Sequence, residues 1–296
     1  MISPLDAQAA AAYRSAASSA AAAVIGRYST SFGLSARLLH EPVRTRVRCI
    51  YALVRVADEI VDGAARGSGL GADQIAASLD AYEAAVEAAR ETGFSTDLVI
   101  HAFARTARET GIGPELTAPF FASMRMDLER SDHTPETFAR YVHGSAEVVG
   151  LMCLHVFATD RSPAPVEPDA RLVEGARRLG AAFQKVNFLR DLHADADARG
   201  RAYFPGIDPA RLTDAQRDLL LDDVDADLAA ARAAIVHLPV SSRAAVLAAH
   251  DLFAELSARL RATPAARLRT RRVRVPDLRK ACIAVRAVAL ARRERA

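Results

Sequence analysis

Tryptophan is absent from the sequence, and other aromatic residues, glycine and proline are scarce. Aromatic residues make up 6% of the 296 positions, with 15 glycines and 13 prolines, whereas alanine occurs in uninterrupted runs such as residues 20–23. Strands favour β-branched and aromatic residues, and alanine is the strongest helix former. The composition therefore favours an all-α fold over one built on a sheet.

Long apolar runs, a secretory leader and paired cysteines are also missing. No apolar run reaches the roughly 20 residues that span a bilayer, and the N-terminus lacks a basic start followed by an apolar block. The three cysteines, Cys49, Cys153 and Cys282, are far apart and show no metal-ligand spacing, as expected of free thiols in a reducing compartment. We therefore expect a cytoplasmic protein.

Apolar residues recur at helical spacing along almost the whole chain. With 51% hydrophobic and 25% charged residues, the chain can form a large core, which excludes intrinsic disorder as its main state. No linker rich in serine, glycine or proline divides the pattern, so we expect one domain over residues 1–296. The segments with helical periodicity are 9–25, 43–61, 72–91, 96–110, 114–129, 135–159, 170–192, 214–238, 241–262 and 277–295.

Two pairs of aspartates stand among apolar neighbours and break the amphipathic pattern. Asp58 and Asp62 form one pair, and Asp191 and Asp195 form the other, each four residues apart. Four residues advance a helix by about 6 Å, so both carboxylates of a pair share one side and repel each other unless a cation neutralises them. Mg²⁺ takes one or two carboxylates and fills its octahedron with water and phosphate oxygens. Two facing pairs could therefore hold a diphosphate through bridging metal ions.

Local ion pairs offer an alternative explanation for the aspartates. Arg55 lies three and four residues before Asp58 and Glu59, so pairing within one helix could neutralise the first segment. The repetition of the pattern favours a phosphate site, because an arginine accompanies each pair and a basic turn at 199–205 follows the second. The acidic run at 222–227 lacks the glycine and terminal glutamate of a calcium loop, and we expect it to be a solvated helix face.

Basic residues gather near the C-terminus, although the net charge is only +3 and the pI about 8.9. No aromatic residues that could stack on bases are interleaved there, so we expect no nucleic-acid interface. Arg272 could reach a diphosphate, and the cluster could equally bind an anionic membrane, so we also expect peripheral contact at the inner membrane face. The cluster comprises Arg267, Arg269, Arg271, Arg272, Arg274, Arg279 and Lys280.

Four blocks of the sequence resemble, in the same order, the motifs of the squalene and phytoene synthase family of head-to-head prenyltransferases. They are residues 28–32, 51–62, 141–151 and 184–205. Two positions depart from the family pattern: Tyr28 stands where many members carry histidine, and 145–150 replaces an Ala-Gly-Thr-Val-Gly run. The resemblance covers about residues 25–290.

The resemblance implies an isoprenoid synthase fold, a single helical domain around a central cavity with both aspartate motifs at one mouth. It also implies binding of Mg²⁺, or of Mn²⁺ in its place. The catalytic residues that it implies are Tyr51, Arg55, Asp58, Asp62, Asp191 and Asp195, and the metal ligands are Asp58, Asp62, Asn187, Asp191 and Asp195. The implied substrate-binding residues are Ser29, Ser31, Phe32, Arg55, Tyr141, Gln184, Asn187, Arg190 and Arg272.

By resemblance, the protein condenses two geranylgeranyl diphosphates to phytoene through a cyclopropylcarbinyl (prephytoene) diphosphate. The form of the first aspartate motif and Glu147 resemble the bacterial phytoene-forming branch. The alternative substrate is farnesyl diphosphate, which would give presqualene diphosphate, squalene or dehydrosqualene, and the length of the apolar tunnel would decide between them. Because no glycine-rich dinucleotide motif follows a strand, we expect no use of NADPH.

An apolar tunnel must keep water away from the cationic intermediates of such a reaction. A catalytically silent helical scaffold is the alternative from another class, and it predicts eroded aspartate motifs, whereas all four aspartates are present here. The sequence makes no prediction of oligomeric state. The candidates for the tunnel wall are Phe32, Leu53, Val54, Tyr141, Ala146, Val149, Gly150, Leu151, Cys153, Leu154, Phe183 and Phe188.

Overall fold

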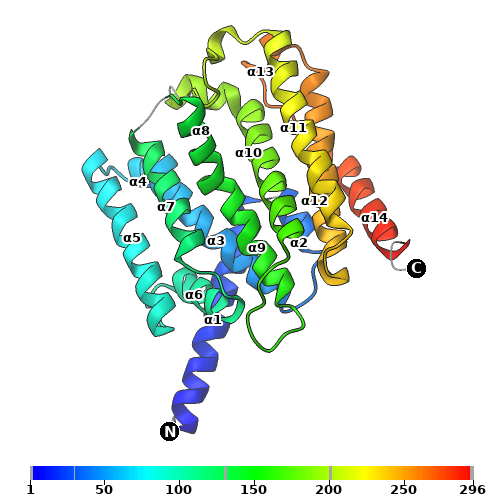
Figure 1. Ribbon diagram of the computed structural model, residues 1–296. Coiled ribbons are helices and arrows are strands. Elements are labelled where there is room, and N and C mark those ends of the chain that lie inside the picture. Colours follow the sequence, from blue (N-terminus) through cyan, green and yellow to red (C-terminus); the bar gives the residue numbers. More distant parts are fainter. Residues whose placement is uncertain (1–2, 30, 130–131, 200–201, 294–296) are drawn as a thin grey trace.

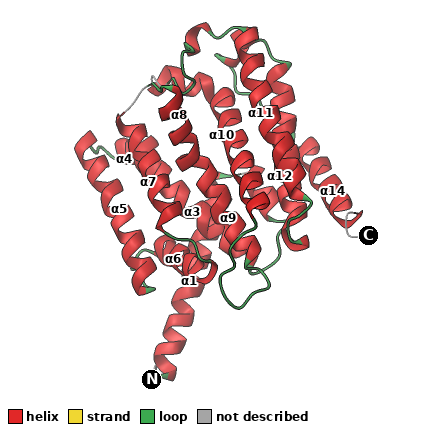
Figure 2. Ribbon diagram, viewed as in Figure 1, coloured by secondary structure: helices red, strands yellow, loops and turns green. Residues whose placement is uncertain are grey.

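Helices form every long regular element in the part of the chain that the structure describes (Figures 1 and 2). The computed structural model describes residues 3–29, 31–129, 132–199 and 202–293, without the side chains of 31–32 and 193–199. Within these ranges the β-structure is limited to an isolated bridge between Asp132 and Ala202. The prediction of an all-α fold is therefore confirmed.

The helices are arranged as a bundle in which α9 and α10 lie in the middle (Figure 1). The helices α5, α6 and α7 lie on one flank, and α11, α12 and α14 lie on the other. The N-terminal end of α1 extends beyond the rest of the bundle. The elements are α1 (Pro4–Tyr28), α2 (Ser31–Ala36), α3 (Val43–Asp62), α4 (Ala64–Gly67), α5 (Ala72–Thr92), α6 (Leu98–Thr110), α7 (Pro114–Glu129), α8 (Pro135–Val142), η1 (His143–Glu147), α9 (Val148–Ala158), α10 (Ala170–Arg199), η2 (Pro209–Arg211), α11 (Asp214–Ile235), α12 (Val240–Arg261), α13 (Ala265–Leu268) and α14 (Asp277–Arg293).

The long helices lie where the periodicity predicts them, and two of them exceed their predicted bounds. Helix α1 begins at Pro4 rather than at residue 9, because the Ser3 side chain accepts a hydrogen bond from the backbone N–H of Asp6 and caps the first turn. Helix α10 continues past the predicted end at residue 192 to Arg199. The charged residues there are compatible with a helix, since residues 193–199 contain no glycine or proline.

Helix α3 shows how the sequence pattern places the core. Ile50, Leu53, Ala57 and Val61 recur at helical spacing and are fully or almost fully buried. Val54 lies beside this stripe and lines the central cavity. The remaining face of the C-terminal half of α3 carries the polar residues of the first aspartate motif.

Two large apolar clusters form the interior. The first joins α3, α5, α6, α7 and α9 and also includes residues of α11, α12 and α14, whereas the second joins α8, α10, α11, α12 and α14. The cavity described below is lined mainly by residues that belong to the first cluster or pack against it, and Leu179 of α10, which packs against the second cluster, also lines it.

Helix α10 approaches η1 and α9 so closely that only glycine fits at the contacts. A Cβ added to Gly180 would lie 2.6 Å from the carbonyl oxygen of Ala146, and one added to Gly150 would lie 2.7 Å from that of Ala176. Neither glycine lies in a turn, and each instead allows the backbones of two helices to lie close together. These contacts bring α9 and α10 together along one wall of the cavity.

Among the described helices, one continuous stretch, Pro135–Ala158, is long and apolar enough by length and composition to cross a membrane. Half of its most apolar window is buried inside the fold. The stretch comprises α8, η1 and α9, which pack against α7 and α10. Core helices pass the same compositional test, so this stretch is weak evidence for a membrane span.

Candidate active site

The first aspartate motif occupies one face of α3. Tyr51, Arg55, Asp58 and Asp62 recur every three or four residues, and all four are half-buried. The Tyr51 side chain is hydrogen-bonded to Ser29, which follows the last residue of α1, and burial raises the pKa of Tyr51. The predicted catalytic residues of α3 and the predicted substrate contact Ser29 therefore lie together.

Arg55 is held by neighbours on its own helix and by an aromatic ring. Its Nη1 atom lies 3.8 Å from Oδ2 of Asp58, and its Nη2 atom pairs with Glu59. The guanidinium carbon lies 4.6 Å from the centroid of the Tyr28 ring, in cation–π contact. The local ion pairing considered from the sequence is thus present. Arg55 Nε is nevertheless buried and has no hydrogen-bond partner among the described residues, so one donor remains for a ligand.

Asp58 lies in surroundings that disfavour its negative charge. Its side chain is 30% exposed, and burial, with the nearby carboxylate of Asp62 as the second cause, raises the pKa of Asp58 from 3.8 to about 8. Asp127 adds to this effect, and Arg55 opposes it. A divalent cation bound here would remove the repulsion among the carboxylates.

The donor set of this site fits Mg²⁺ better than a metal that needs a complete protein cage. Among the side chains that the structure describes, no three acidic, histidine or cysteine groups are arranged as metal ligands. Mg²⁺ typically uses one or two carboxylates and takes its other ligands from water and phosphate. Asp58 and Asp62 meet that requirement, so the predicted assignment of these residues to a metal is chemically consistent with the structure.

The second aspartate motif lies on α10. Gln184, Asn187 and Asp191 recur every three or four residues and are half-buried. Asp191 is paired with two arginines: Nη2 of Arg190 lies 2.5 Å from its Oδ2 atom, and Nε of Arg272 lies 2.7 Å from its Oδ1 atom. Burial and the neighbouring Arg190 lower the pKa of Arg272. Two guanidinium groups share one carboxylate, which leaves positive charge for a phosphate group.

Three predicted site residues lie outside the described part of the chain. These are the side chains of Ser31, Phe32 and Asp195, positions at which the structure describes the backbone alone. The basic turn expected at 199–205 likewise includes residues 200–201, which lie outside it. The predicted roles of these residues stay predictions.

A cluster of tyrosines and one further aspartate connects the two motifs. Asp127 of α7 accepts hydrogen bonds from the hydroxyl groups of Tyr141, at 2.8 Å, and Tyr203, at 3.5 Å. The Tyr203 ring stacks on Phe188 of α10, with the ring centroids 3.9 Å apart. Asp127 also acts electrostatically on Asp58. This chain of contacts runs from the first motif to the second, so the structure brings the two motifs to one end of the bundle.

The sequence reasoning missed Asp127 as a site residue. The sequence around Asp127 gives little indication of a site, because a single aspartate in a helical segment is most often a surface residue. The hydroxyl partner Tyr141 was predicted as a substrate contact, and the structure places it in this cluster rather than on the cavity wall.

An apolar cavity of about 230 Å³ lies between α3, α9, α10, α11 and α12. Most of the predicted wall is confirmed, while Leu53 and Leu151 lie in or against the first apolar cluster and Phe188 joins the aromatic cluster. Leu53 misses the cavity because it lies on the core stripe of α3. The predicted wall residues that line the cavity are Val54, Ala146, Val149, Gly150, Cys153, Leu154 and Phe183.

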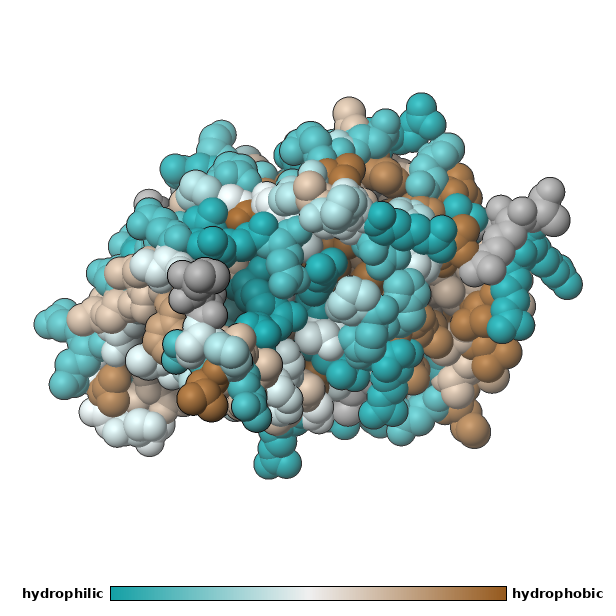
Figure 3. All heavy atoms as spheres, turned by 90° about the horizontal axis from the view of Figure 1, so that it is seen from below, coloured by the Kyte–Doolittle hydropathy of each residue, from teal (hydrophilic) through white to brown (hydrophobic). Residues whose placement is uncertain are grey.

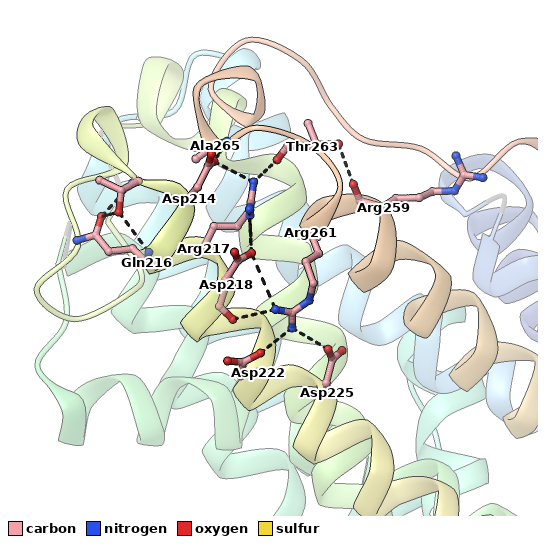
Figure 4. Close-up of polar contacts among 11 residues, drawn as sticks. Asp214, Gln216, Arg217, Asp218, Asp222, Asp225, Arg259, Arg261, Thr263 and Ala265 are labelled. Carbon is pink, nitrogen blue, oxygen red and sulfur yellow. Dashed lines mark hydrogen bonds and ion pairs between the residues drawn. The ribbon is translucent and has the colours of Figure 1, made fainter.

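The acidic run on α11 is used for ion pairs (Figure 4). Arg261 of α12 lies 2.9 Å from Asp222 and 2.8 Å from Asp225, and both carboxylates are largely exposed, as a solvated helix face requires. Asp227 is an exception to the prediction. Its side chain is only 3% exposed and is paired with Lys185, at 2.7 Å, and with Arg178, at 3.1 Å. The prediction is wrong for Asp227 because α10 covers that part of α11.

The fold and the site define a class: a helical isoprenoid synthase fold with two polar aspartate motifs next to an apolar cavity. The sequence profile of the family described as Squalene/phytoene synthase matches residues 25–279, so the chain belongs to this family. It is 33% identical over 202 residues to the 15-cis-phytoene synthase of Synechocystis sp., covering 67% of this chain and 58% of that protein. The chain thus spans less than two thirds of that relative.

A second relative is matched over more of its length. The 15-cis-phytoene synthase of Paracoccus sp. is 28% identical over 249 residues, which cover 79% of this chain and 78% of that protein. Among solved structures, a dehydrosqualene synthase superimposes with a TM-score of 0.77 at 19% identity, covering 95% of this chain and 98% of that one. This structural likeness shows the fold.

Proposed function

We propose that the protein is a Mg²⁺-dependent prenyltransferase, acting as a single domain, that condenses two geranylgeranyl diphosphates head to head to phytoene. The observation that carries this proposal is the position of two half-buried aspartate motifs at one end of the bundle, next to an apolar cavity. The family and the names of its phytoene synthase relatives support it.

The two parts of the substrate would be bound by different parts of the site. The diphosphates would lie between α3 and α10, where Arg55, Arg190 and Arg272 supply positive charge and Gln184 and Asn187 supply amide groups. The prenyl chains would lie in the cavity, whose lining is almost entirely apolar. The diphosphates would stay out of the apolar cavity because burying a charged group without partners costs free energy.

The chemistry would need no protein nucleophile. Bound Mg²⁺, or Mn²⁺ in its place, held by Asp58, Asp62, Asn187, Asp191 and Asp195, would supply charge stabilisation for the departing diphosphate. The arginines of the site would stabilise the same charge. One substrate would lose diphosphate, and its allylic cation would be attacked by the double bond of the other substrate, with loss of a proton, to give the cyclopropylcarbinyl diphosphate.

The second half of the reaction would remove the remaining diphosphate. Rearrangement of the resulting cation and loss of a second proton would give the hydrocarbon. Neither half consumes a reductant, so the proposed reaction proceeds without NADPH. The apolar wall would exclude water from both cations.

The cavity supports the longer substrate. It follows η1 and α9 from Ser145 to Phe157, which corresponds to about 18 Å of helix. Small side chains line much of it, as a long prenyl chain would require, and farnesyl diphosphate remains the alternative substrate. The alanines in the wall are Ala36, Ala146, Ala176, Ala231, Ala234, Ala245 and Ala249.

The direct test supplies purified protein with Mg²⁺ and either geranylgeranyl or farnesyl diphosphate, without NADPH, and identifies the products by mass spectrometry. Phytoene from the longer substrate supports the proposal. Presqualene diphosphate or dehydrosqualene from the shorter one keeps the reaction type and overturns the substrate. No product from either, with native far-UV circular dichroism, supports the scaffold alternative.

Chain length can be tested within the cavity at Cys153, whose half-buried side chain lines the wall. The Cys153→Phe variant narrows the cavity, and we expect turnover with geranylgeranyl diphosphate to fall about tenfold, with a smaller loss for farnesyl diphosphate. Cys153→Ala is the control that leaves the space open. Equal losses for both substrates in Cys153→Phe would contradict the assignment of the cavity to the prenyl chain.

We also propose that the protein lies at the inner face of the membrane through α14. Leu278, Cys282, Val285 and Ala289 form an exposed apolar stripe at helical spacing, with Leu278 84% and Val285 70% exposed. Exposed arginines flank the stripe, and Figure 3 shows hydrophobic and hydrophilic atoms side by side on the flank of the C-terminal helix. An apolar stripe between arginines matches the surface of an anionic bilayer.

The membrane proposal is tested by co-sedimentation with vesicles that contain phosphatidylglycerol, compared with vesicles of phosphatidylcholine alone. We expect binding to the anionic vesicles at low salt and its loss in the Leu278→Glu/Val285→Glu variant. Leu219→Glu, which changes an exposed leucine on α11, is the matched control. Equal sedimentation of wild type and the α14 variant would contradict the proposal.

A further inference from the structure

One half-buried carboxylate of the site belongs to neither aspartate motif. Asp127 lies near the C-terminal end of α7, between α3 and α8. Its Oδ2 atom lies 2.8 Å from the hydroxyl oxygen of Tyr141, and its Oδ1 atom lies 3.5 Å from that of Tyr203. Asp127 takes part in none of the proposed diphosphate or metal contacts, and its hydrogen bonds to the two tyrosines indicate a different role.

The two tyrosines need an acceptor because both are buried. Tyr141 is 3% exposed and Tyr203 is 8% exposed. Burial and the nearby carboxylate raise the pKa of Tyr141 well above its ordinary value, so its hydroxyl group stays protonated and donates. An ionised carboxylate accepts through both oxygens and donates through neither, which allows it to bind two hydroxyl groups at once.

The same contacts join segments that are far apart in the sequence. Tyr141 ends α8, and Tyr203 follows α10, while Asp127 belongs to α7. The Tyr203 ring stacks on Phe188 at 3.9 Å with an interplanar angle of 12°, and Phe188 lies between Asn187 and Arg190 on the motif helix. The position of Tyr203 therefore affects the helix that carries the second motif.

We propose that Asp127 is a positioning residue for the reaction: its carboxylate fixes the rings of Tyr141 and Tyr203 and thereby holds the second aspartate motif against the first. This inference rests on the proposed function. The effect of Asp127 on the reaction is transmitted through the tyrosines, so it should change turnover more than substrate affinity. A 1 Å displacement of groups at a reacting centre can reduce rates by about 100-fold.

The test compares wild type with Asp127→Asn, Tyr203→Phe and the double variant. Asparagine has the shape of aspartate but carries an NH2 donor in place of one acceptor oxygen, so one of the two tyrosine hydroxyl groups loses its acceptor. We expect kcat to fall about tenfold in Asp127→Asn with KM within twofold, and the double variant to be no slower than Asp127→Asn. Such non-additivity shows that the two residues act through one contact.

The matched control is Asp80→Asn, which removes a carboxylate that pairs with Arg125, two residues before Asp127 on α7. It should keep kcat within twofold of wild type. The proposal is overturned if Asp127→Asn also stays within twofold, or if the separate losses of Asp127→Asn and Tyr203→Phe multiply in the double variant. A purely structural role would lower the melting temperature without this coupling in kcat.

A second readout needs no activity and separates this inference from the proposed function. Because the chain has no tryptophan and six tyrosines, its near-UV circular dichroism reports mainly on tyrosine environments. We expect Asp127→Asn and Tyr203→Phe to change this band similarly, with native far-UV spectra. An unchanged near-UV band in Asp127→Asn overturns the positioning role. If the band changes in Asp127→Asn but the wild-type protein has no prenyltransferase activity, only the proposed function is overturned.

Discussion

Two acid-rich regions of the molecule differ in how their carboxylates are neutralised. On α3, Asp58 lies 3.8 Å from Arg55, but burial and the nearby carboxylates of Asp62 and Asp127 outweigh that pair and raise the pKa of Asp58 to about 8. On α11, Asp222 and Asp225 share Arg261, and Asp214 and Asp218 share Arg217 (Figure 4).

The difference distinguishes a binding site from a structural surface. On α11 the arginine pairs neutralise exposed carboxylates and stabilise a contact between helices. Carboxylates that face one another lower stability until a cation joins them, and such clusters are typical of functional sites. Spacing alone does not separate the two, since both regions carry aspartates three or four residues apart on a helix.

The largest expected effect is on turnover. Asp58→Asn removes a charge from the proposed metal site, and we expect the rate of product formation to fall by about 100-fold or more, with native circular dichroism. Asp222→Asn, the same change on α11, should leave the rate within twofold. The measurement is product formation by mass spectrometry, and similar rates for both variants would contradict the functional distinction between the regions.

The second effect is on stability and lies within the acidic run itself. Asp227 is 3% exposed and binds Lys185 and Arg178, whereas the Asp222 side chain is 68% exposed. Breaking a buried ion pair by removing one partner costs about 3–5 kcal/mol, and an exposed pair is worth under about 1 kcal/mol. Denaturant titration should therefore show a large loss for Asp227→Ala and a small one for Asp222→Ala. Equal losses would refute the burial of Asp227.

The third effect is the response to metal. Mg²⁺ with inorganic diphosphate should raise the melting temperature of wild type, because binding to the folded state stabilises it. The shift should be absent in Asp58→Asn and unchanged in Asp222→Asn. Differential scanning fluorimetry measures it, and a full shift in Asp58→Asn would place the metal elsewhere.

The smallest effect is the pH dependence without metal. The pKa of Asp58 is about 8 in the folded protein and 3.8 ordinarily, so between these values the folded state binds more protons than the unfolded chain. Stability should therefore fall as the pH rises from about 5 to 8. Asp58→Asn removes this titration, and at pH 8 its melting temperature should exceed that of wild type by about 2 °C or more. A steeper loss of stability in Asp58→Asn than in wild type would contradict the raised pKa.

Helix positions were largely predictable because they depend on local patterns. The stripe of α3 and the capped start of α1 follow from residues close in sequence. The length of α10 was underestimated, since charged residues were interpreted as a loop although they are compatible with a helix. The short helices α2, α4 and α13 have too few residues to show a period.

The candidate site was predictable only where a motif repeats. The aspartate pairs and their arginines were found because the same spacing occurs twice. Asp127 carries no such repetition, and its role depends on Tyr203, which is 76 residues away in sequence. Arg272 was suggested from charge alone, and its partner Asp191 is 81 residues away.

The sequence by itself determined that the protein is all-helical, which helix faces are apolar and which two helices carry the paired aspartates, because each of these depends on residues within a few turns of one another. Only the tertiary structure decided which carboxylates have arginine partners, which apolar residues line a cavity and that Asp127 contacts two tyrosines. These properties depend on contacts between segments that are far apart in the sequence, such as the close approach of α9 and α10 at Gly150 and Gly180.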